Sequence, residues 1–376
     1  MRILITGGAG FIGSNLAKKL IESNHYVRIL DNFSMQIHGG NQSLDHELSG
    51  VDLIIGDVRD KSAIAKSLEG IDTVVHLAAE TGTGQSMYKI EEYQQTNIAG
   101  TLNIIDHLLN KKHSVEKIVV ASSRAIYGEG QYFCEEDGMI FPGERSETEM
   151  LNGQFEHRCE NSQKFMKPIA TPETAKLAPL SFYGLTKQIQ EQIVIMYAKV
   201  LGISGYALRY QNVYGPGQSL MNPYTGIMAI FSSLGRNNET IKIFEDGKQT
   251  RDFVYIDDVI GATISCLSPD KKGVGIYNVG TGKPTSVYQI AEMIVKYLNS
   301  NSDLEITGEY RLGDIRHNYA DLEKVEKELG FTPIIDIQDG LKNFLDWASL
   351  QPKSKLNFKT SLDELSDVGL LRKSEK

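Results

Sequence analysis

The segment RILITGGAGFIGSNLAKKLIES, residues 2–23, contains the pattern that decides the fold. A short apolar run, 2–6, leads into four glycines and then into an amphipathic stretch, which predicts a strand, a tight turn and a helix. Because glycine lacks a side chain, the backbone of such a turn can approach a ligand closely, and the helix N-terminus that follows attracts an anion. The segment therefore predicts a strand–turn–helix unit that holds a pyrophosphate.

The residues that follow repeat the alternation of strand and helix. Further apolar runs lie at 26–30, 51–55, 73–77, 117–121 and 205–210, and long helical stretches lie at 96–109 and 182–201. Short β-branched runs separated by helices are typical of a parallel sheet that is covered on both faces. The sequence therefore predicts an α/β fold of the Rossmann type, with a doubly wound parallel sheet.

The character of the chain changes along its 376 residues, and we divide it accordingly. Residues 1–211 are predicted to form the dinucleotide-binding domain, and 212–350 a smaller, mixed α/β domain for the substrate. Within the first domain, residues 129–180 are polar and acidic, which indicates an insertion over the sheet edge. Residues 351–376 are interpreted as a surface helix and tail without chemistry.

Composition excludes several classes of partner. With 39 Lys and Arg against 48 Asp and Glu, the net charge is −9, which argues against a protein that coats nucleic acid. No apolar run approaches the roughly 18–20 residues of a membrane span, and no signal peptide is evident. Three cysteines fit a reducing compartment and a cytoplasmic location. Cys134 and Cys159 lack a C-x-x-C pattern, so we expect two thiols and no metal site.

An acidic residue after the second predicted strand identifies the dinucleotide. Asp31 stands where a carboxylate can bind both ribose hydroxyls and would repel a 2′-phosphate, so NAD is favoured over NADP. Asp57, after the third strand, either caps a turn or meets the adenine edge. A tight turn without any ligand is the alternative interpretation of the glycines, and their strand–helix context counts against it.

Three residues form a candidate catalytic group. Tyr183 and Lys187 are four apart near the start of a predicted helix, so both face one side, and Ser123 follows the fifth strand. A Y-x-x-x-K pair alone is usually a surface pair. Beside Ser123, however, Lys187 and a positively charged nicotinamide are expected to lower the pKa of Tyr183 and make it a base for an alcohol proton.

These residues belong to a longer set of motifs that resembles a known family. From Met1 to about Trp347 the chain resembles the NAD-dependent sugar-nucleotide epimerase/dehydratase family of extended short-chain dehydrogenase/reductases. The motifs are GGAGFIG (7–13), LDN (30–32), GDVRD (56–60), HLAA (76–79), NIAGT (97–101), SSRAIYG (122–128), YGLTK (183–187), RYQNVYGPG (209–217), RDFVYIDDV (251–259) and RLGDIRHNYAD (311–321).

The resemblance implies roles for individual residues. It places catalysis on Ser123, Tyr183 and Lys187. The implied NAD-binding residues are Gly7, Gly10, Phe11, Ile12, Gly13, Asp31, Asn32, Asp57, Val58, Leu77, Ala78, Ala79, Asn97, Ser122, Tyr183, Lys187 and Tyr210. The implied substrate-binding residues are Thr83, Ser123, Arg124, Asn212, Arg251 and Arg316, of which the last two are expected to bind the diphosphate. Residues 212–350 would then bind the nucleotide sugar.

The residues after Ser123 separate two reactions of this family. Its dehydratases carry an Asp-Glu pair there, whereas this chain has Arg124 and Ala125, so elimination is disfavoured. Oxidation at C4 followed by return of the hydride to the opposite face remains, which is 4-epimerisation with retained NAD. The strings LAAETGTGQSMY (77–88) and SSRAIYGEG (122–130) further resemble bacterial dTDP-L-rhamnose 4-epimerases. That resemblance implies interconversion of dTDP-L-rhamnose and dTDP-6-deoxy-L-talose, for polysaccharide precursors.

Three other interpretations stay open at this point. One is a UDP-hexose 4-epimerase with the same chemistry, and another is a nucleotide-sugar 4-ketoreductase that releases its cofactor at each turnover. The third is a non-catalytic NAD-sensing or scaffold protein, because a fold alone does not determine function. Relatives pair through helices that correspond to 96–110 and 183–200, so we also expect a homodimer.

Overall fold

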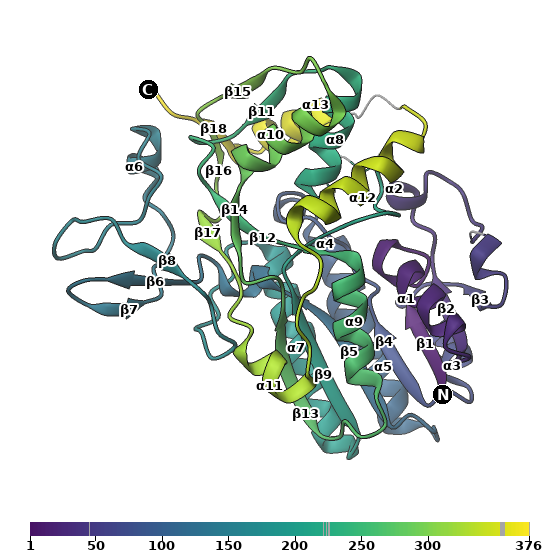
Figure 1. Cartoon of the computed structure of the whole chain (residues 1–376). Coiled ribbons are helices and arrows are strands. Elements are labelled where there is room, and N and C mark those ends of the chain that lie inside the picture. Colours follow the sequence, from purple (N-terminus) through teal and green to yellow (C-terminus); the bar gives the residue numbers. More distant parts are fainter. Residues whose placement is uncertain (45, 221, 223, 225, 354–357, 376) are drawn as a thin grey trace.

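A seven-stranded parallel sheet forms the centre of the computed structural model, which describes residues 1–44, 46–220, 222, 224, 226–353 and 358–375. Its strand order is β13-β9-β5-β4-β1-β2-β3 (Figure 1). The strands are β1 (Arg2–Thr6), β2 (Tyr26–Asp31), β3 (Asp52–Ile55), β4 (Thr73–His76), β5 (Lys117–Ser123), β9 (Ser204–Tyr210) and β13 (Val274–Val279). This arrangement confirms the predicted doubly wound α/β fold.

Helices cover both faces of this sheet because its strands are apolar on both sides. In β1, Ile3 and Ile5 pack on one face and Leu4 on the other, as the pleat of a strand requires. The first face is covered by α1 (Phe11–Glu22) and α9 (Ile256–Leu267). The second face is covered by α3 (Lys61–Leu68), α5 (Gly100–Asn110) and α7 (Phe182–Leu201).

The boundary between the two halves is less simple than the predicted division at residue 211. Strand β13 pairs in parallel with β9 along its whole length, from Val274 opposite Gly205 to Val279 opposite Tyr210. Helix α9 packs against α1. The chain therefore crosses into the second half after β9 and returns to complete the central sheet, which nothing in the local sequence pattern indicates.

Most of the remaining second half consists of small sheets and helices above the central sheet, whereas the short helix α11 (Glu323–Leu329) lies beside β13 (Figure 1). Its strands are β10 (Asn212–Tyr214), β11 (Ile241–Ile243), β12 (Thr250–Tyr255), β14 (Pro284–Ser286), β15 (Leu304–Ile306), β16 (Glu309–Arg311), β17 (His317–Asn318) and β18 (Leu371–Lys373). Its helices are α8 (Ile227–Asn237), α10 (Val287–Leu298), α11 (Glu323–Leu329), α12 (Ile337–Leu350) and α13 (Phe358–Asp367). Short helices in the first half are α2 (Met35–His38) and α4 (Ile90–Tyr93).

The insertion 129–180 forms a lobe of its own at the side of the molecule (Figure 1). It contains α6 (Glu147–Leu151) and a three-stranded antiparallel sheet of β6 (Gln131–Cys134), β7 (Gly138–Ile140) and β8 (Lys167–Ile169).

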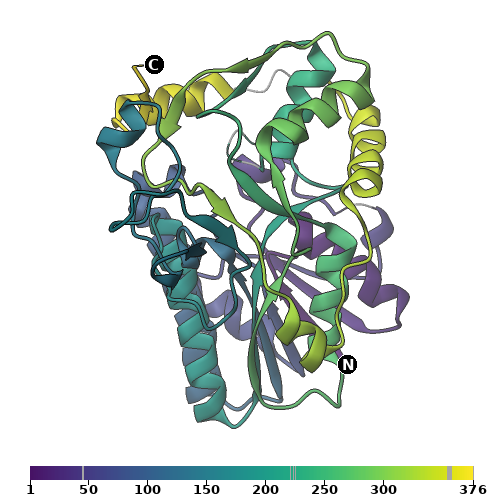
Figure 2. The same ribbon diagram turned by 60° about the vertical axis from the view of Figure 1, so that its left-hand side comes forward.

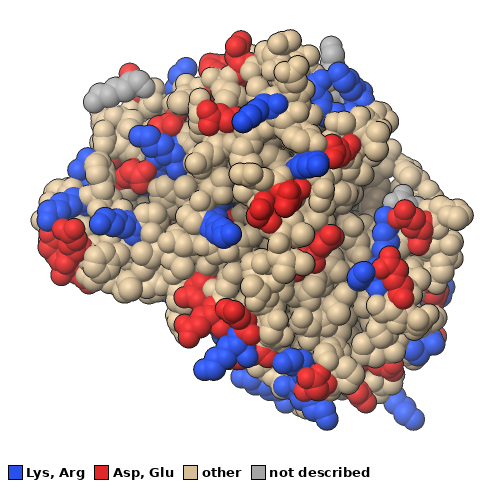
Figure 3. Space-filling model, in the orientation of Figure 1, with Lys and Arg blue, Asp and Glu red and all other residues tan. Residues whose placement is uncertain are grey.

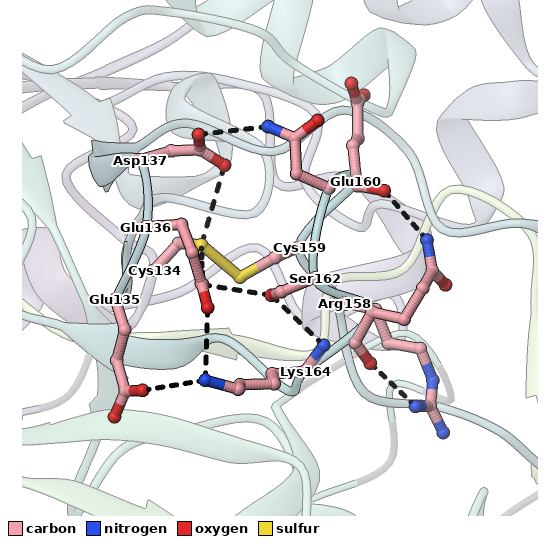
Figure 4. Close-up of a disulfide and its surroundings, with 11 residues drawn as sticks. Cys134, Glu135, Glu136, Asp137, Arg158, Cys159, Glu160, Ser162 and Lys164 are labelled. Carbon is pink, nitrogen blue, oxygen red and sulfur yellow. Dashed lines mark hydrogen bonds and ion pairs between the residues drawn. A yellow bond between two sulfur atoms is a disulfide. The ribbon is translucent and has the colours of Figure 1, made fainter.

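A disulfide joins Cys134 to Cys159 within this lobe (Figure 4), so the expectation of two thiols was wrong. The two cysteines are 25 residues apart in the sequence, and the fold of the lobe brings them together. The Glu136 carboxylate lies beside the two sulfurs, within 4.8 Å. Cys266 is buried as a free thiol.

Two global properties of the chain are also visible. Among the described residues no helix is long and apolar enough to cross a membrane. Acidic and basic side chains are interspersed over the face shown in Figure 3, and no broad basic patch dominates it. This distribution fits the net charge of −9.

Candidate functional site

A cavity of about 670 Å³ lies at the carboxyl ends of the central strands, between the two halves of the chain. Its walls come from the glycine turn, from the ends of β2 and β5, from the start of α7 and from loops of the second half. This is the crevice in which doubly wound sheets bind ligands, and its volume suits an extended small molecule.

The glycine turn at one end of the cavity can be built only without side chains. Gly7 has a φ of +69°, and a Cβ there would lie 2.8 Å from the Ala78 backbone. A Cβ at Gly13 would lie 2.4 Å from the Gly7 carbonyl oxygen. Gly10 is the N-cap of α1 and provides no side-chain cap, so the first backbone N–H groups of the helix face the cavity and can bind a pyrophosphate.

Asp31 lies at the end of β2, beside this turn. Its two carboxylate oxygens accept hydrogen bonds from the backbone N–H groups of Ala9, at 2.9 Å, and Phe33, at 2.8 Å. These bonds fix the carboxylate at the wall of the cavity, where it can reach a ribose. The second strand and the glycine turn therefore form one binding surface.

Most of the residues predicted to bind NAD line this cavity. They are Gly7, Gly10, Phe11, Ile12, Gly13, Asp31, Asn32, Val58, Leu77, Ala78, Ala79, Ser122, Tyr183, Lys187 and Tyr210. Two others, Asp57 and Asn97, are not among the lining residues. Asp57 is bound to Arg59 and to Asn32, and Asn97 is fully buried.

Asn97 connects the cavity wall to the helix of the catalytic group. Its side-chain carbonyl accepts the Glu80 N–H at 2.8 Å, and its amide donates to the Thr186 hydroxyl at 2.9 Å. It lies in a π-helix, Gln94–Ala99, and such a local widening is frequent at functional sites. Asn97 thereby joins the cavity wall to α7, and its contact with the cofactor stays a prediction.

Ser123, Tyr183 and Lys187 converge on the cavity as the sequence predicts. The Ser123 hydroxyl lies near enough to the Tyr183 phenol to act on its pKa. The Lys187 ammonium donates to the Ala121 carbonyl at 3.0 Å and lies 5.9 Å from the centre of the Tyr183 ring. The backbone N–H of Tyr183 donates to the Ser86 hydroxyl at 2.9 Å, which fixes the start of α7.

The electrostatics of this group differ in part from the expectation. The pKa of Tyr183 is raised overall by burial, although the nearby Ser123 hydroxyl and the charge of Arg124 act to lower it, so the expected lowering is not seen in the chain alone. Burial also lowers the pKa of Lys187 to about 7. Arg124 therefore also acts on the phenol, although the family resemblance had linked it only to the substrate.

A buried ion pair supports the strand that ends in Ser123. Glu191 on α7 binds Arg209 on β9 through both oxygens, at 2.6 and 3.0 Å, and accepts the Ser122 hydroxyl at 2.7 Å. Both charged side chains are at most 3% exposed. The pair thereby ties α7, β5 and β9 together directly beneath the cavity.

The variant Glu191→Ala is expected to lower the free energy of unfolding by about 3–5 kcal/mol, because it leaves the Arg209 charge buried without its partner. Urea denaturation of the purified protein measures this loss. Glu292→Ala, which removes an exposed carboxylate on α10, is the matched control and should change stability by at most about 0.5 kcal/mol. Equal stability of the two variants would contradict the role of the ion pair.

Elsewhere in the wall of the cavity, three arginines surround one carboxylate. Arg124, Arg251 and Arg311 all line the cavity, and Asp314 accepts hydrogen bonds from Arg251 at 3.2 Å and Arg311 at 2.7 Å. The three guanidinium groups hold the pKa of Asp314 well below its usual range. Three cations around one anion leave a positive surplus, which suits a diphosphate.

The structure corrects one predicted diphosphate ligand. Arg316 is fully buried and does not line the cavity. Its guanidinium binds the carboxylates of Glu156, Glu245 and Asp246, and so attaches the insertion to the second half. Arg311, at the start of the same RLGDIR string, faces the cavity instead. Both positions are arginines in one motif, so only their burial distinguishes them.

The remaining predicted substrate residues also line the cavity, namely Thr83, Ser123, Arg124, Asn212 and Arg251. Asn212 accepts a hydrogen bond from Arg124 at 3.1 Å. Sequence reasoning missed the C-terminal segment, from which Ser361, Leu362 and Leu365 form part of the wall. The amphipathic string SLDELSDVGLL was the available signal, although an amphipathic helix alone does not show what it covers.

Comparison with known proteins agrees with this geometry. Residues 3–147 and 162–280 match the model of the NAD dependent epimerase/dehydratase family. The chain is 35% identical over 349 residues to a dTDP-L-rhamnose 4-epimerase of Burkholderia thailandensis, which covers 92% of this chain and 94% of that protein. It is 33% identical to a putative UDP-glucose 4-epimerase of Methanocaldococcus jannaschii, over 92% of this chain and 97% of that protein.

A solved structure shows the same likeness in three dimensions. The UDP-glucuronic acid 4-epimerase of Bacillus cereus, in complex with UDP-glucuronic acid and NAD, superposes with a TM-score of 0.73 and is 28% identical. The match covers 92% of this chain and 98% of that one.

Proposed function

The chain belongs to the NAD dependent epimerase/dehydratase family, and on that premise we propose that it is a nucleotide-sugar 4-epimerase that retains NAD. One observation carries the proposal: the Ser123–Tyr183–Lys187 group and the arginine cluster lie in one cavity with the glycine turn. The position after Ser123 holds Arg124, not the carboxylate that a dehydratase of this family uses for elimination.

The residues of the cavity fit NAD from end to end. The glycine turn and the start of α1 would bind the pyrophosphate, Asp31 the adenosine ribose, and Tyr183 with Lys187 the nicotinamide ribose side. When bound, NAD supplies a hydride acceptor that can return the hydride.

The chain's own residues would handle the proton and the sugar. The Tyr183 oxygen takes the proton of the C4 hydroxyl, Ser123 holds that hydroxyl in place, and Tyr183 returns the proton when the alcohol forms again. Lys187, buried beside the phenol, stabilises its deprotonated form. Arg124, Arg251 and Arg311 bind the diphosphate and leave the sugar ring free to turn, so that its opposite face can be reduced.

The sugar we propose is L-rhamnose carried on dTDP, with dTDP-6-deoxy-L-talose as its C4 epimer. The 35% identity to the Burkholderia thailandensis enzyme over nearly the full length supports this assignment. A UDP-hexose is the second candidate, favoured by the Methanocaldococcus jannaschii relative and the Bacillus cereus structure.

Incubation of the protein with dTDP-L-rhamnose tests this function, with the configuration at C4 read by NMR. We expect the 6-deoxy-L-talose epimer to appear without added NAD. Conversion of UDP-glucose alone would establish the UDP-hexose alternative. Reduction of a keto sugar with consumption of one NADH per turnover would instead identify a 4-ketoreductase.

Arg311→Gln is expected to weaken the binding of dTDP-sugars about ten- to a hundredfold, because it removes a charged hydrogen bond to the diphosphate. Isothermal titration calorimetry with dTDP measures the change. Lys283→Gln, an exposed cation outside the cavity, serves as the control. An unchanged dissociation constant for Arg311→Gln would contradict binding of the diphosphate by this arginine cluster.

A second copy of the chain is the proposed partner. Helices α5 and α7 pack side by side and expose large apolar side chains, namely Leu102, Leu109, Leu185, Met196 and Val200. An apolar face of this kind on two adjacent helices suits a symmetric four-helix contact. Analytical ultracentrifugation should give the mass of a dimer, about twice 41.8 kDa.

A further inference from the structure

The C-terminal segment folds back onto the substrate half of the molecule. Strand β18 pairs antiparallel with β16, with Leu371 opposite Arg311, and the Leu312 N–H donates to the Leu370 carbonyl at 3.0 Å. Helix α13 lies just before this strand (Figure 2, yellow, beside the C label). The segment is therefore attached directly to the strand that carries a cavity-lining arginine.

One side of α13 closes the cavity. Ser361 and Leu365, one helical turn apart, are at most 4% exposed, and both line the cavity together with the half-buried Leu362. Asp363 and Ser366, on the other side, are exposed. The helix thus presents Ser361 and two leucines to the cavity, and Asp363 and Ser366 to water.

Leu365 lies against the loop that holds the catalytic tyrosine. A Cβ added to Gly84 would meet the Leu365 methyl group at 3.2 Å, so the two residues are in close contact. The same loop carries Ser86, which accepts the backbone N–H of Tyr183. Leu365 therefore lines the part of the cavity beside the catalytic tyrosine, which is the sugar side of the cavity under the proposed function.

Two tyrosines fix the helix in this position. The Glu364 carboxylate accepts hydrogen bonds from the hydroxyls of Tyr88, at 2.5 Å, and Tyr224. Tyr88 follows the loop that carries Gly84 and Ser86, and Tyr224 lines the cavity from the second half. Both halves of the protein thus hold α13 over the sugar side.

We infer that α13 is the sugar-side wall of the site and that its leucines select a sugar with a methyl group at C6, a 6-deoxyhexose. This inference rests on the proposed function. A C6 hydroxyl facing Leu362 and Leu365 would lose its hydrogen bonds to water and gain no partner from these side chains. An apolar wall discriminates against an added hydroxyl by up to about a hundredfold, so we expect a preference of ten- to a hundredfold.

Two pairs of ligands that differ only at C6 test this selection: dTDP-L-rhamnose with dTDP-L-mannose, and dTDP-D-fucose with dTDP-D-galactose. Calorimetry gives the dissociation constant of each, and NMR gives its epimerisation. The full-length protein should prefer the methyl member of the pair it binds. Leu365→Asn should reduce that preference at least about fivefold, whereas Leu350→Asn, at an exposed site on α12, should retain it.

Thermal denaturation confirms that each variant is folded, and Leu362→Asn replaces Leu365→Asn if that protein does not fold. If the wild-type protein binds both members of a pair with equal affinity, the inference is overturned. If it still epimerises either member, the proposed function nevertheless stands. An unchanged preference in the leucine variants also overturns the inference. If no member of either pair binds, the inference fails together with the proposed function.

Discussion

Tyr183→Phe is expected to lower kcat at least about a hundredfold, the lower end of what a positioned general base contributes. The hydroxyl that this variant removes lies near Ser123, on a ring whose centre is 5.9 Å from the Lys187 ammonium. Without it, the C4 proton has no acceptor, although the ring still fills its place at the start of α7. The substitution should therefore lower kcat and leave the amount of retained NAD and the melting temperature unchanged.

The measurement is turnover of dTDP-L-rhamnose at neutral pH, together with the NAD released on denaturation. Tyr297→Phe, which removes an exposed phenol hydroxyl on α10, is the matched control and should keep wild-type turnover. Turnover of Tyr183→Phe close to the control would refute Tyr183 as the base and leave Lys187 or Ser123 to be tested in its place.

Gly13→Ala is expected to abolish the retention of NAD. The added methyl group would lie 2.4 Å from the Gly7 carbonyl oxygen and 2.6 Å from the Gly8 Cα, both of which are backbone atoms that cannot rotate away. The turn must therefore open, which displaces the N–H groups at the start of α1 from the pyrophosphate. The same clash is expected to cost about 1–3 kcal/mol of stability.

The NAD content of the purified variant, measured after denaturation, checks this prediction. Gly261→Ala places a methyl group on α9, where no atom lies within 4 Å, so it is the control for a glycine without close neighbours. Circular dichroism shows whether Gly13→Ala is folded. A folded Gly13→Ala protein with a full complement of NAD would contradict the role of the glycine turn.

Much of the fold and the core of the site could be predicted from the sequence because local signals were strong. The glycine turn follows a strand and precedes a helix, and Tyr183 and Lys187 share one helical face. Ser123 was predictable because parallel strands present their carboxyl ends to one crevice. Each of these features depends on a few adjacent residues, and the cavity lining agrees with them.

The parts that could not be predicted depend on contacts between distant segments. Arg311 and Arg316 stand in one motif, and the burial of Arg316 among carboxylates from the insertion and from residues 245–246 separates them. The Cys134–Cys159 disulfide forms because the lobe brings two separate segments together. The covering of the cavity by Leu365 requires the pairing of β18 with β16, which the tail's own sequence does not indicate.

The central claim is that one hydride leaves C4 of the sugar and returns to the opposite face within the same protein. Incubation with dTDP-L-rhamnose carrying deuterium at C4, without added cofactor, tests it most directly by NMR and mass spectrometry of the product. We predict that the product is dTDP-6-deoxy-L-talose that retains the deuterium at C4. Inverted product in which solvent hydrogen has replaced the deuterium would contradict it.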